Sequence, residues 1–124
     1  MNTPYGTQHQ PTEIRLVRET KCLEVDFDSG ETFSLPAELL RVESPSAEVQ
    51  GHGPSQKVIV GGKREVAIIG IDAVGNYAVR LRFDDLHDTG IYSWEFLYDM
   101  GKRQAEIWEK YLADLAREGL SRDR

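Results

Sequence analysis

A chain of 124 residues, 40% of them hydrophobic and 29% charged, is long enough for one globular domain and needs no disulfide or metal to bury a core. The formal net charge of -6 argues against a general affinity for nucleic-acid backbones or anionic membrane surfaces, because both attract a positive protein surface. Cys22 is the only cysteine, which excludes an internal disulfide and a zinc site built from cysteines.

The two ends of the chain predict tails around a single domain. A polar segment with two prolines and a glycine predicts a flexible tail over residues 1–11, followed by one domain over residues 12–119 and a short tail over residues 120–124. The first ten residues lack the basic start and apolar stretch of a signal peptide, and no apolar run reaches 18 residues. We therefore expect a cytoplasmic protein with no membrane or nucleic-acid partner.

Alternating apolar and polar side chains predict strands in the first third of the chain. Ile14 and Leu16 alternate with charged residues, and the segment KCLEVDFDSGETFSL repeats this pattern on both sides of a DSGE turn. Gly30 supplies the positive φ that such a turn often requires, so the segment predicts a β-hairpin. PAELLRVE then predicts a short helix, with Pro36 in its first turn and Ser34 as a possible cap.

The remaining segments predict more strands and then helices. KVIV, EVAIIGID and YAVRLRF are typical of strands. The period changes to about 3.6 over residues 93–119, where Trp108, Leu112 and Leu115 share an apolar stripe and Gly101 divides a short helix from a longer one. Strands followed by helices, with hairpin-length connections, predict an α+β fold. We expect a mostly antiparallel sheet of five or six strands with the C-terminal helices packed against it.

A catalytic constellation is missing from the residue pattern. The three histidines are not accompanied by a G-x-S-x-G nucleophile elbow, and GGKRE lacks the spacing of a phosphate-binding loop. Asp84, Asp85, His87 and Asp88 are dense enough to suggest a divalent cation, but their spacing matches no EF-hand or zincin helix and their residue types are typical of turns. We expect no enzymatic activity and no cofactor.

Two segments together resemble a known family. LPAELLRVESPSAEVQGHG (residues 35–53) and VGNYAVRLRFDDLHDTGIYSWEFLYDMG (residues 74–101) look like the N-terminal domain of gamma-butyrobetaine hydroxylase, in its small stand-alone bacterial form. In the hydroxylases the iron and 2-oxoglutarate chemistry belongs to a separate, larger domain, so the resemblance implies no catalysis. The same small domain also occurs fused to P-loop scaffold proteins of iron–sulfur cluster assembly, which implies an accessory role.

The resemblance also implies that the loop RVESPSAEVQG corresponds to a zinc-binding loop. In the hydroxylases this domain holds a structural zinc with three cysteines of a C-x-C-x-x-C loop and one distant histidine. The cysteine positions fall at Ser44, Ser46 and Val49 of this sequence, and the histidine falls at His87. Hydroxyls are poor zinc ligands and valine is none, so the loop resembles a zinc knuckle whose ligands have been replaced.

Two functions remain open at this point. The first is a non-catalytic accessory module that binds a protein partner, or forms a homodimer, with His52, Asp85, Asp88 and Tyr92 as candidate contacts in its loops. The second is a metal-binding or iron–sulfur-assembly accessory protein, in which His87 joins His52 and nearby carboxylates around zinc or another divalent ion. For His87 we favour a structural role that bridges the turn, because the remaining donors have no defined geometry.

Overall fold

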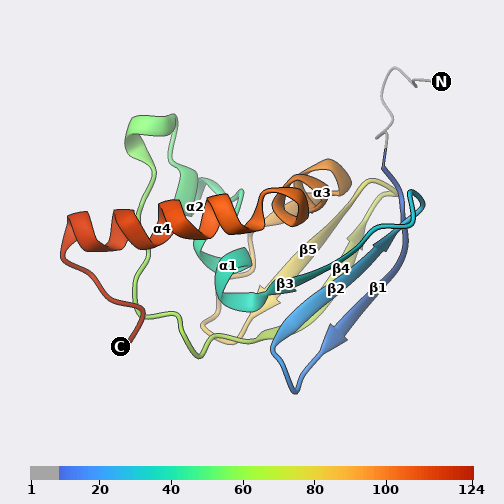
Figure 1. The fold of residues 1–124 in the computed structure, drawn as a ribbon, viewed down its shortest axis with the longest axis horizontal. Coiled ribbons are helices and arrows are strands. Elements are labelled where there is room, and N and C mark those ends of the chain that lie inside the picture. Colours follow the sequence, from blue (N-terminus) through green and yellow to red (C-terminus); the bar gives the residue numbers. More distant parts are fainter. Residues whose placement is uncertain (1–8) are drawn as a thin grey trace.

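The structure, a computed structural model that describes residues 9–124, contains two three-stranded antiparallel sheets and a set of helices (Figure 1). The first sheet has the order β1 (Pro11–Val17), β2 (Cys22–Phe27), β3 (Thr32–Pro36), and the second has the order β4 (Ile68–Val74), β5 (Ala78–Phe83), β6 (Ile91–Ser93). The helices are α1 (Ala37–Val42), α2 (Ala47–Gln50), the 3-10 helix η1 (Pro54–Gln56), α3 (Trp94–Lys102) and α4 (Gln104–Glu118). The predicted α+β class is confirmed, while the prediction of one sheet with five or six strands is wrong.

The two sheets stay separate because β3 leads into helices and not into another strand. The segment KVIV, residues 57–60, was expected to be a strand, but its backbone bonds to helices. The Val58 N–H donates to the carbonyl of Val49 on α2 at 2.7 Å, and the Val60 carbonyl accepts the hydroxyl of Tyr111 on α4 at 2.6 Å. With this segment engaged elsewhere, no backbone ladder connects β3 to β4.

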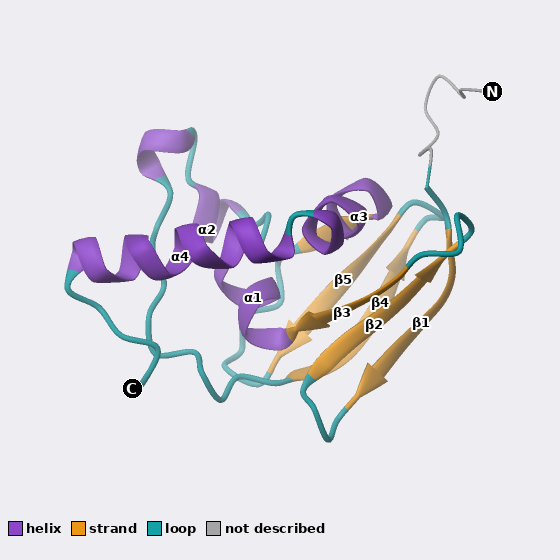
Figure 2. Ribbon diagram, viewed as in Figure 1, coloured by secondary structure: helices purple, strands orange, loops and turns teal. Residues whose placement is uncertain are grey.

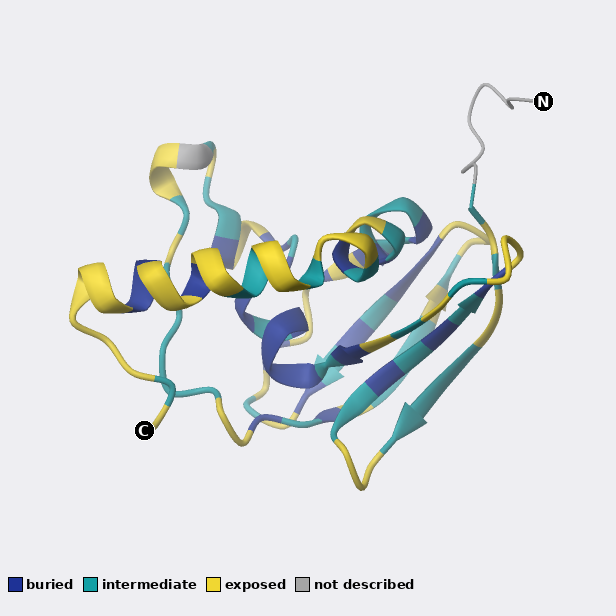
Figure 3. Ribbon diagram, in the orientation of Figure 1, coloured by how far each residue is buried: buried dark blue, intermediate teal, exposed yellow. Residues whose placement is uncertain are grey.

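One apolar core nevertheless joins the two sheets. Leu23 and Leu35 of the first sheet and Leu81 and Phe83 of the second belong to one cluster of buried, contacting side chains, to which α1 and α3 also contribute. The alternation of buried and partly exposed residues along β2 is visible in Figure 3. Each fully buried large apolar side chain contributes about 1.5–3 kcal/mol, so this shared core holds the sheets together without shared backbone hydrogen bonds.

The predicted hairpin between β2 and β3 is confirmed. Val25 pairs with Phe33, and the Phe27 N–H donates to the Glu31 carbonyl at 2.8 Å. Gly30 has φ +93°, a backbone conformation that costs glycine little and other residues more. Helix α1 follows β3 directly. The residue that precedes this helix is Pro36, which makes no side-chain capping bond, so the expected Ser34 cap is absent.

The two C-terminal helices are confirmed, with the break two residues later than expected. α3 runs through Gly101 to Lys102, contacts β3, and is followed by α4, which extends away from the sheets (Figure 2). Leu112 was expected on the apolar stripe but is 39% exposed, while Tyr111 and Leu115 are buried. Gly101 is needed for packing and not for the break, because a Cβ at this position would overlap the ring of Phe33 on β3.

Gly101→Ala is expected to lower the free energy of unfolding by up to about 2 kcal/mol, because overpacking costs about 1–3 kcal/mol and a better helix former returns about 1 kcal/mol. Urea denaturation followed by circular dichroism measures the change. Gly53→Ala is the control, since a Cβ there meets no atom within 4 Å. Equal unfolding midpoints for the two variants would contradict the packing role of Gly101.

The first described residues lie against the domain. Most of the predicted tail over residues 1–11 is outside the described residues, but Pro11 already begins β1. The ring of His9 stacks on Tyr98 with centroids 3.5 Å apart, and its Nδ1 lies 3.1 Å from a carboxylate oxygen of Glu95. Among residues 9–124, no helix is long and apolar enough to cross a membrane.

The last residues differ from the predicted tail over residues 120–124, because they are bonded to the domain. The Ser121 carbonyl accepts the Gly62 N–H at 2.8 Å, and the Arg122 carbonyl accepts the Arg64 N–H at 3.1 Å. Gly119 ends α4 in the left-handed conformation, with φ +69°, and turns the chain back towards these partners. The C-terminal segment is therefore a short strap on the surface.

Candidate functional site

Two loops that are far apart in the sequence meet at one end of the domain. The loop that contains α2, residues 43–51, follows α1, and the loop over residues 84–90 connects β5 with β6. Ser44 Oγ lies 2.9 Å from His87 Nε2, and Ser46 Oγ lies 2.7 Å from the hydroxyl of Thr89. Ser44 is 0% exposed and His87 is 6% exposed, so the contact between the loops is buried.

The protonation of His87 follows from its surroundings. Burial lowers the pKa of His87 and Arg41 lowers it further, while the carboxylate of Glu48 acts in the opposite direction. The neutral ring donates its Nδ1–H to Glu48 Oε1 at 2.9 Å and accepts the Ser44 hydroxyl at Nε2. Ser44 Oγ in turn accepts the Ser46 N–H at 3.2 Å, which completes a chain of hydrogen bonds across the two loops.

Asp85 attaches the second loop to the body of the domain. Its carboxylate accepts Arg41 Nε at 2.7 Å, Lys63 Nζ at 2.6 Å and the His87 N–H at 3.0 Å. Burial alone would raise the pKa of Asp85, but the bonds from Lys63, the His87 N–H and Arg41 lower it to about 2. Asp85 is therefore ionised and fully engaged, and its role is to position the loop.

The other predicted contact residues have different environments. Tyr92 was expected among the contacts but is 0% exposed, and its hydroxyl donates to the Leu40 carbonyl at 2.5 Å, so a partner cannot reach it. Asp85 is half-buried and occupied by the ion pairs described above. His52 and Asp88 are exposed, so they remain predicted contacts. His52 lies just after the first loop, before η1, and its backbone N–H donates to the Gln56 side chain.

The residues at the cysteine positions do not fit zinc. Ser44 and Ser46 turn their hydroxyls towards the second loop, while Val49 is 2% exposed and offers no donor. The single thiol, that of Cys22, lies on β2. In the part of the chain that the structure describes, no group of three or more His, Cys, Asp or Glu side chains is placed to hold a metal ion. Hydroxyls alone do not replace thiolates as zinc ligands.

Ser44, His87 and Glu48 are hydrogen-bonded in the same sequence as the serine, histidine and acid of a hydrolase triad, but the serine is not accessible to a substrate. A nucleophilic serine must reach the substrate carbonyl and transfer its proton to the histidine. Ser44 is fully buried, its oxygen accepts the Ser46 N–H, and a Cβ at Gly90 would lie only 2.5 Å from that oxygen. The backbone of Gly90 thus covers the hydroxyl, and the three residues act as a structural network.

Sequence reasoning missed the most unusual residue of the second loop. Leu86 is 87% exposed and has φ +75°, a left-handed backbone conformation that is uncommon for a bulky residue. The turn around it is closed by two hydrogen bonds, from the Leu86 N–H to the Phe83 carbonyl at 3.1 Å and from the Phe83 N–H to the His87 carbonyl at 3.0 Å. A leucine inside DDLHD carries no sequence signal of exposure, since leucine is usually a core residue.

Comparison with known proteins gives a consistent result. The model of one protein family, described as gamma-butyrobetaine hydroxylase-like, N-terminal, matches residues 14–98. One protein with an NMR solution structure is 50% identical, over 98% of this chain and 91% of its own, with a TM-score of 0.82. A second is 44% identical, over 94% and 92% of the two chains, with a TM-score of 0.81.

A crystal structure extends the comparison. A protein of unknown function from Acidithiobacillus ferrooxidans, which belongs to the DUF971 family, is 41% identical over 74% of this chain and 92% of its own, with a TM-score of 0.64. No protein of curated function matches the sequence. The similarities therefore concern fold and family.

Proposed function

Since the chain belongs to the family of gamma-butyrobetaine hydroxylase-like N-terminal domains, we propose that it is a non-catalytic accessory module that binds a protein partner through the loop between β5 and β6. The observation that carries this proposal is the presentation of Leu86, which is 87% exposed at the tip of a turn with a left-handed backbone. An uncommon backbone conformation of this kind persists when the surrounding structure enforces it, and such residues concentrate at functional sites.

The loop is suited to recognition because it is held in place before any partner arrives. On one side of Leu86, Asp85 is bound by Arg41 and Lys63, and on the other side His87 is bound by Ser44. A pre-organised loop loses little conformational entropy on binding, so more of the contact energy remains as affinity. The hydrogen bonds between the two loops thus support the proposed contact surface without touching a partner.

The charges around Leu86 indicate the chemistry of the partner. Asp84 and Asp88 are exposed, and Glu48 lies close by through its bonds to His87 and Thr89. Asp84 accepts only a backbone N–H in the described structure, and Asp88 lies 4.0 Å from Arg80. An apolar side chain surrounded by exposed carboxylates is complementary to an apolar pocket with a basic rim.

Leu86→Asn is expected to weaken partner binding about 30-fold or more, the effect of removing a residue that contributes about 2 kcal/mol to an interface. Asparagine tolerates the left-handed backbone, so the unfolding midpoint should stay unchanged or rise. Calorimetric titration of the partner, first identified by co-purification with the wild-type chain, measures the affinity. Leu112→Asn, at another partly exposed leucine on α4, is the matched control. Equal affinities for the two variants would refute the assignment of the loop.

We further infer that the first loop is the counterpart of a zinc knuckle whose ligands have been replaced. The support is the position of Ser44 and Ser46, whose hydroxyls bond to His87 and Thr89 of the second loop. Hydrogen bonds then perform the task of joining the two loops that a metal ion performs elsewhere. The metal-binding alternative finds less support, because His87 has both ring nitrogens engaged and Asp85 is occupied by cations.

A further inference from the structure

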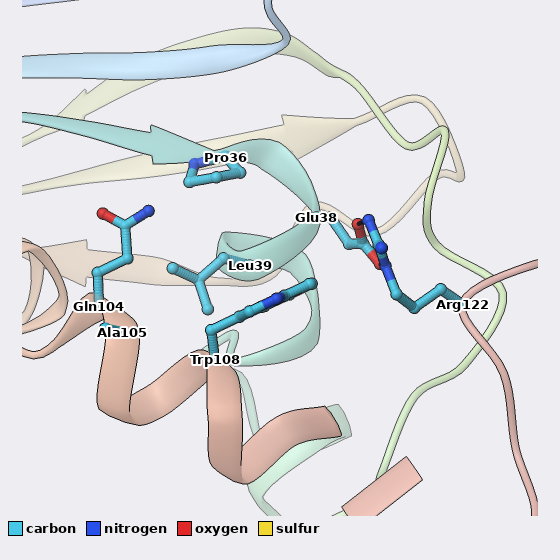
Figure 4. A pocket seen from close by; sticks show the side chains of 7 residues that line it. All are labelled: Pro36, Glu38, Leu39, Gln104, Ala105, Trp108 and Arg122. Carbon is cyan, nitrogen blue, oxygen red and sulfur yellow. Dashed lines mark hydrogen bonds and ion pairs between the residues drawn. The ribbon is translucent and has the colours of Figure 1, made fainter. Parts of the chain in front are cut away.

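A groove between α1 and α4 lies apart from the two loops and has its own polar end. It has a volume of about 500 Å³ and lies between Pro36 and Leu39 on one side and Ala105 and Trp108 on the other (Figure 4). One end is closed by Glu38, which faces Arg122 of the C-terminal strap. Its size and mostly apolar lining are typical of a site that accepts a side chain or a small ligand.

Glu38 and Trp108 form a receptor for a guanidinium group. The side chain of Glu38 is 7% exposed, and its two oxygens accept Arg122 Nε at 2.8 Å and Nη2 at 2.7 Å. The Cζ of Arg122 lies 5.1 Å from the centroid of the Trp108 ring. Two parallel bonds to a buried carboxylate and contact with an aromatic face are both features of arginine recognition, and lysine cannot reproduce the two-pronged geometry.

Arg122, which occupies this receptor, lies on the C-terminal strap, and the strap can detach from the domain surface. Arg122 follows the end of α4 at Gly119, and two backbone hydrogen bonds hold its neighbourhood, from Gly62 to Ser121 and from Arg64 to Arg122. An exposed ion pair between Arg64 and Asp123 adds to them, and such surface pairs contribute little to stability. Its side chain is 30% exposed. Opening of a chain terminus costs far less free energy than global unfolding, whereas the buried carboxylate of Glu38 strongly requires a cation.

We propose that this groove binds an arginine side chain of a partner protein, and that Arg122 occupies the site in the free chain as an exchangeable intramolecular ligand. The apolar part of the groove, beside Pro36 and Leu39, lies open next to the guanidinium position and accommodates an apolar neighbour of the incoming arginine. The site uses no residue of the loop around Leu86, so the inference stands independently of the contact surface proposed above.

The test uses the full chain and Nα-acetyl-arginine amide as the probe. Arg122→Ala empties the receptor, and the variant is expected to bind the probe saturably, one per chain, with NMR shifts at Leu39 and at the indole of Trp108. Nα-acetyl-citrulline amide has the same shape without the charge and should produce no saturable shifts. The double variant Arg122→Ala, Glu38→Gln should lose the response to the arginine probe. A folded Arg122→Ala chain that does not bind the probe, or binds it equally well without Glu38, would overturn the proposal.

Titration of the wild-type chain with the same probe shows whether Arg122 is an exchangeable ligand or part of a fixed structural ion pair. Tethered Arg122 competes at an effective concentration in the millimolar range, so the wild type should bind the probe on the order of ten-fold more weakly than Arg122→Ala. The same resonances should move, and the Arg122 Nε–H signal should shift as its side chain is displaced. A wild-type chain that shows no shifts at probe concentrations that saturate Arg122→Ala would show a fixed clamp and refute exchange. If Arg122→Ala does not fold, this wild-type titration decides alone.

Discussion

His87→Ala is expected to lower the free energy of unfolding by about 2–4 kcal/mol, without any involvement of a metal. The ring of His87 is buried and bonded at both nitrogens, to Ser44 and to Glu48. Its removal leaves a cavity and deprives the fully buried Ser44 hydroxyl of its acceptor, and both losses are costly. Because His87 joins the two loops, the loop around Leu86 should also become more mobile, which NMR relaxation or hydrogen exchange would detect.

The control for this prediction is His52→Ala, which removes an exposed histidine of the neighbouring loop and should change stability by no more than about 0.5 kcal/mol. Both variants and the wild type are melted with added zinc and with a chelator. We expect each protein to unfold at the same temperature under the two conditions. A wild-type melting temperature that rises with zinc, and loses this rise in His87→Ala, would instead support the metal-binding alternative.

The contribution of His87 to the free energy of unfolding should decrease as the pH falls. The pKa of His87 in the folded chain lies below its ordinary value of 6.5, because burial and Arg41 disfavour the imidazolium. The unfolded chain therefore takes up the proton more readily, so stability that is present above pH 6.5 is lost as the pH falls below it. The stability difference between wild type and His87→Ala should accordingly narrow in acid, as denaturant titrations across this pH range would measure.

The triple variant Ser44→Cys, Ser46→Cys, Val49→Cys is expected to acquire a tetrahedral zinc site with His87 as the fourth ligand. Thiolates bind zinc at about 2.3 Å and imidazole at about 2.0–2.1 Å, which places a sulfur and a nitrogen ligand roughly 3.5 Å apart. Ser44 Oγ already lies 2.9 Å from His87 Nε2, so the two loops need to separate only slightly. An apparent zinc-binding free energy on the order of 10 kcal/mol is expected at neutral pH.

Elemental analysis should find one zinc per chain in the triple variant, and cobalt substitution should give the absorption bands of a thiolate site. The double variant Ser44→Cys, Ser46→Cys is the matched control, since two thiolates and His87 leave one coordination position without a protein ligand and should bind zinc more weakly. A folded triple variant that binds no more zinc than wild type would contradict the assignment of the first loop as a former zinc knuckle.

Some features of the structure were predicted from local sequence patterns, and one contact was predicted only from the resemblance to a family. The hairpin around Gly30 and the helices after Ser93 follow from local patterns, and both are present. The meeting of Ser44 with His87 could not be derived from spacing, since 43 residues separate them, and it was anticipated only through the resemblance to a family. Tyr92 was misassigned to the surface because its loop neighbours are polar, whereas its ring fills the core.

The sequence by itself determined the class of the fold, the hairpin around Gly30, the presence of two C-terminal helices, and the absence of a cysteine-built metal site. These properties depend on residue types and on patterns among a few neighbouring residues, and neither depends on the tertiary structure. Only the tertiary structure decided that the strands divide into two sheets, that Leu86 is exposed, and that Arg122 returns to Glu38. Each of these depends on contacts between distant segments, where competition for partners, and not local preference, selects the outcome.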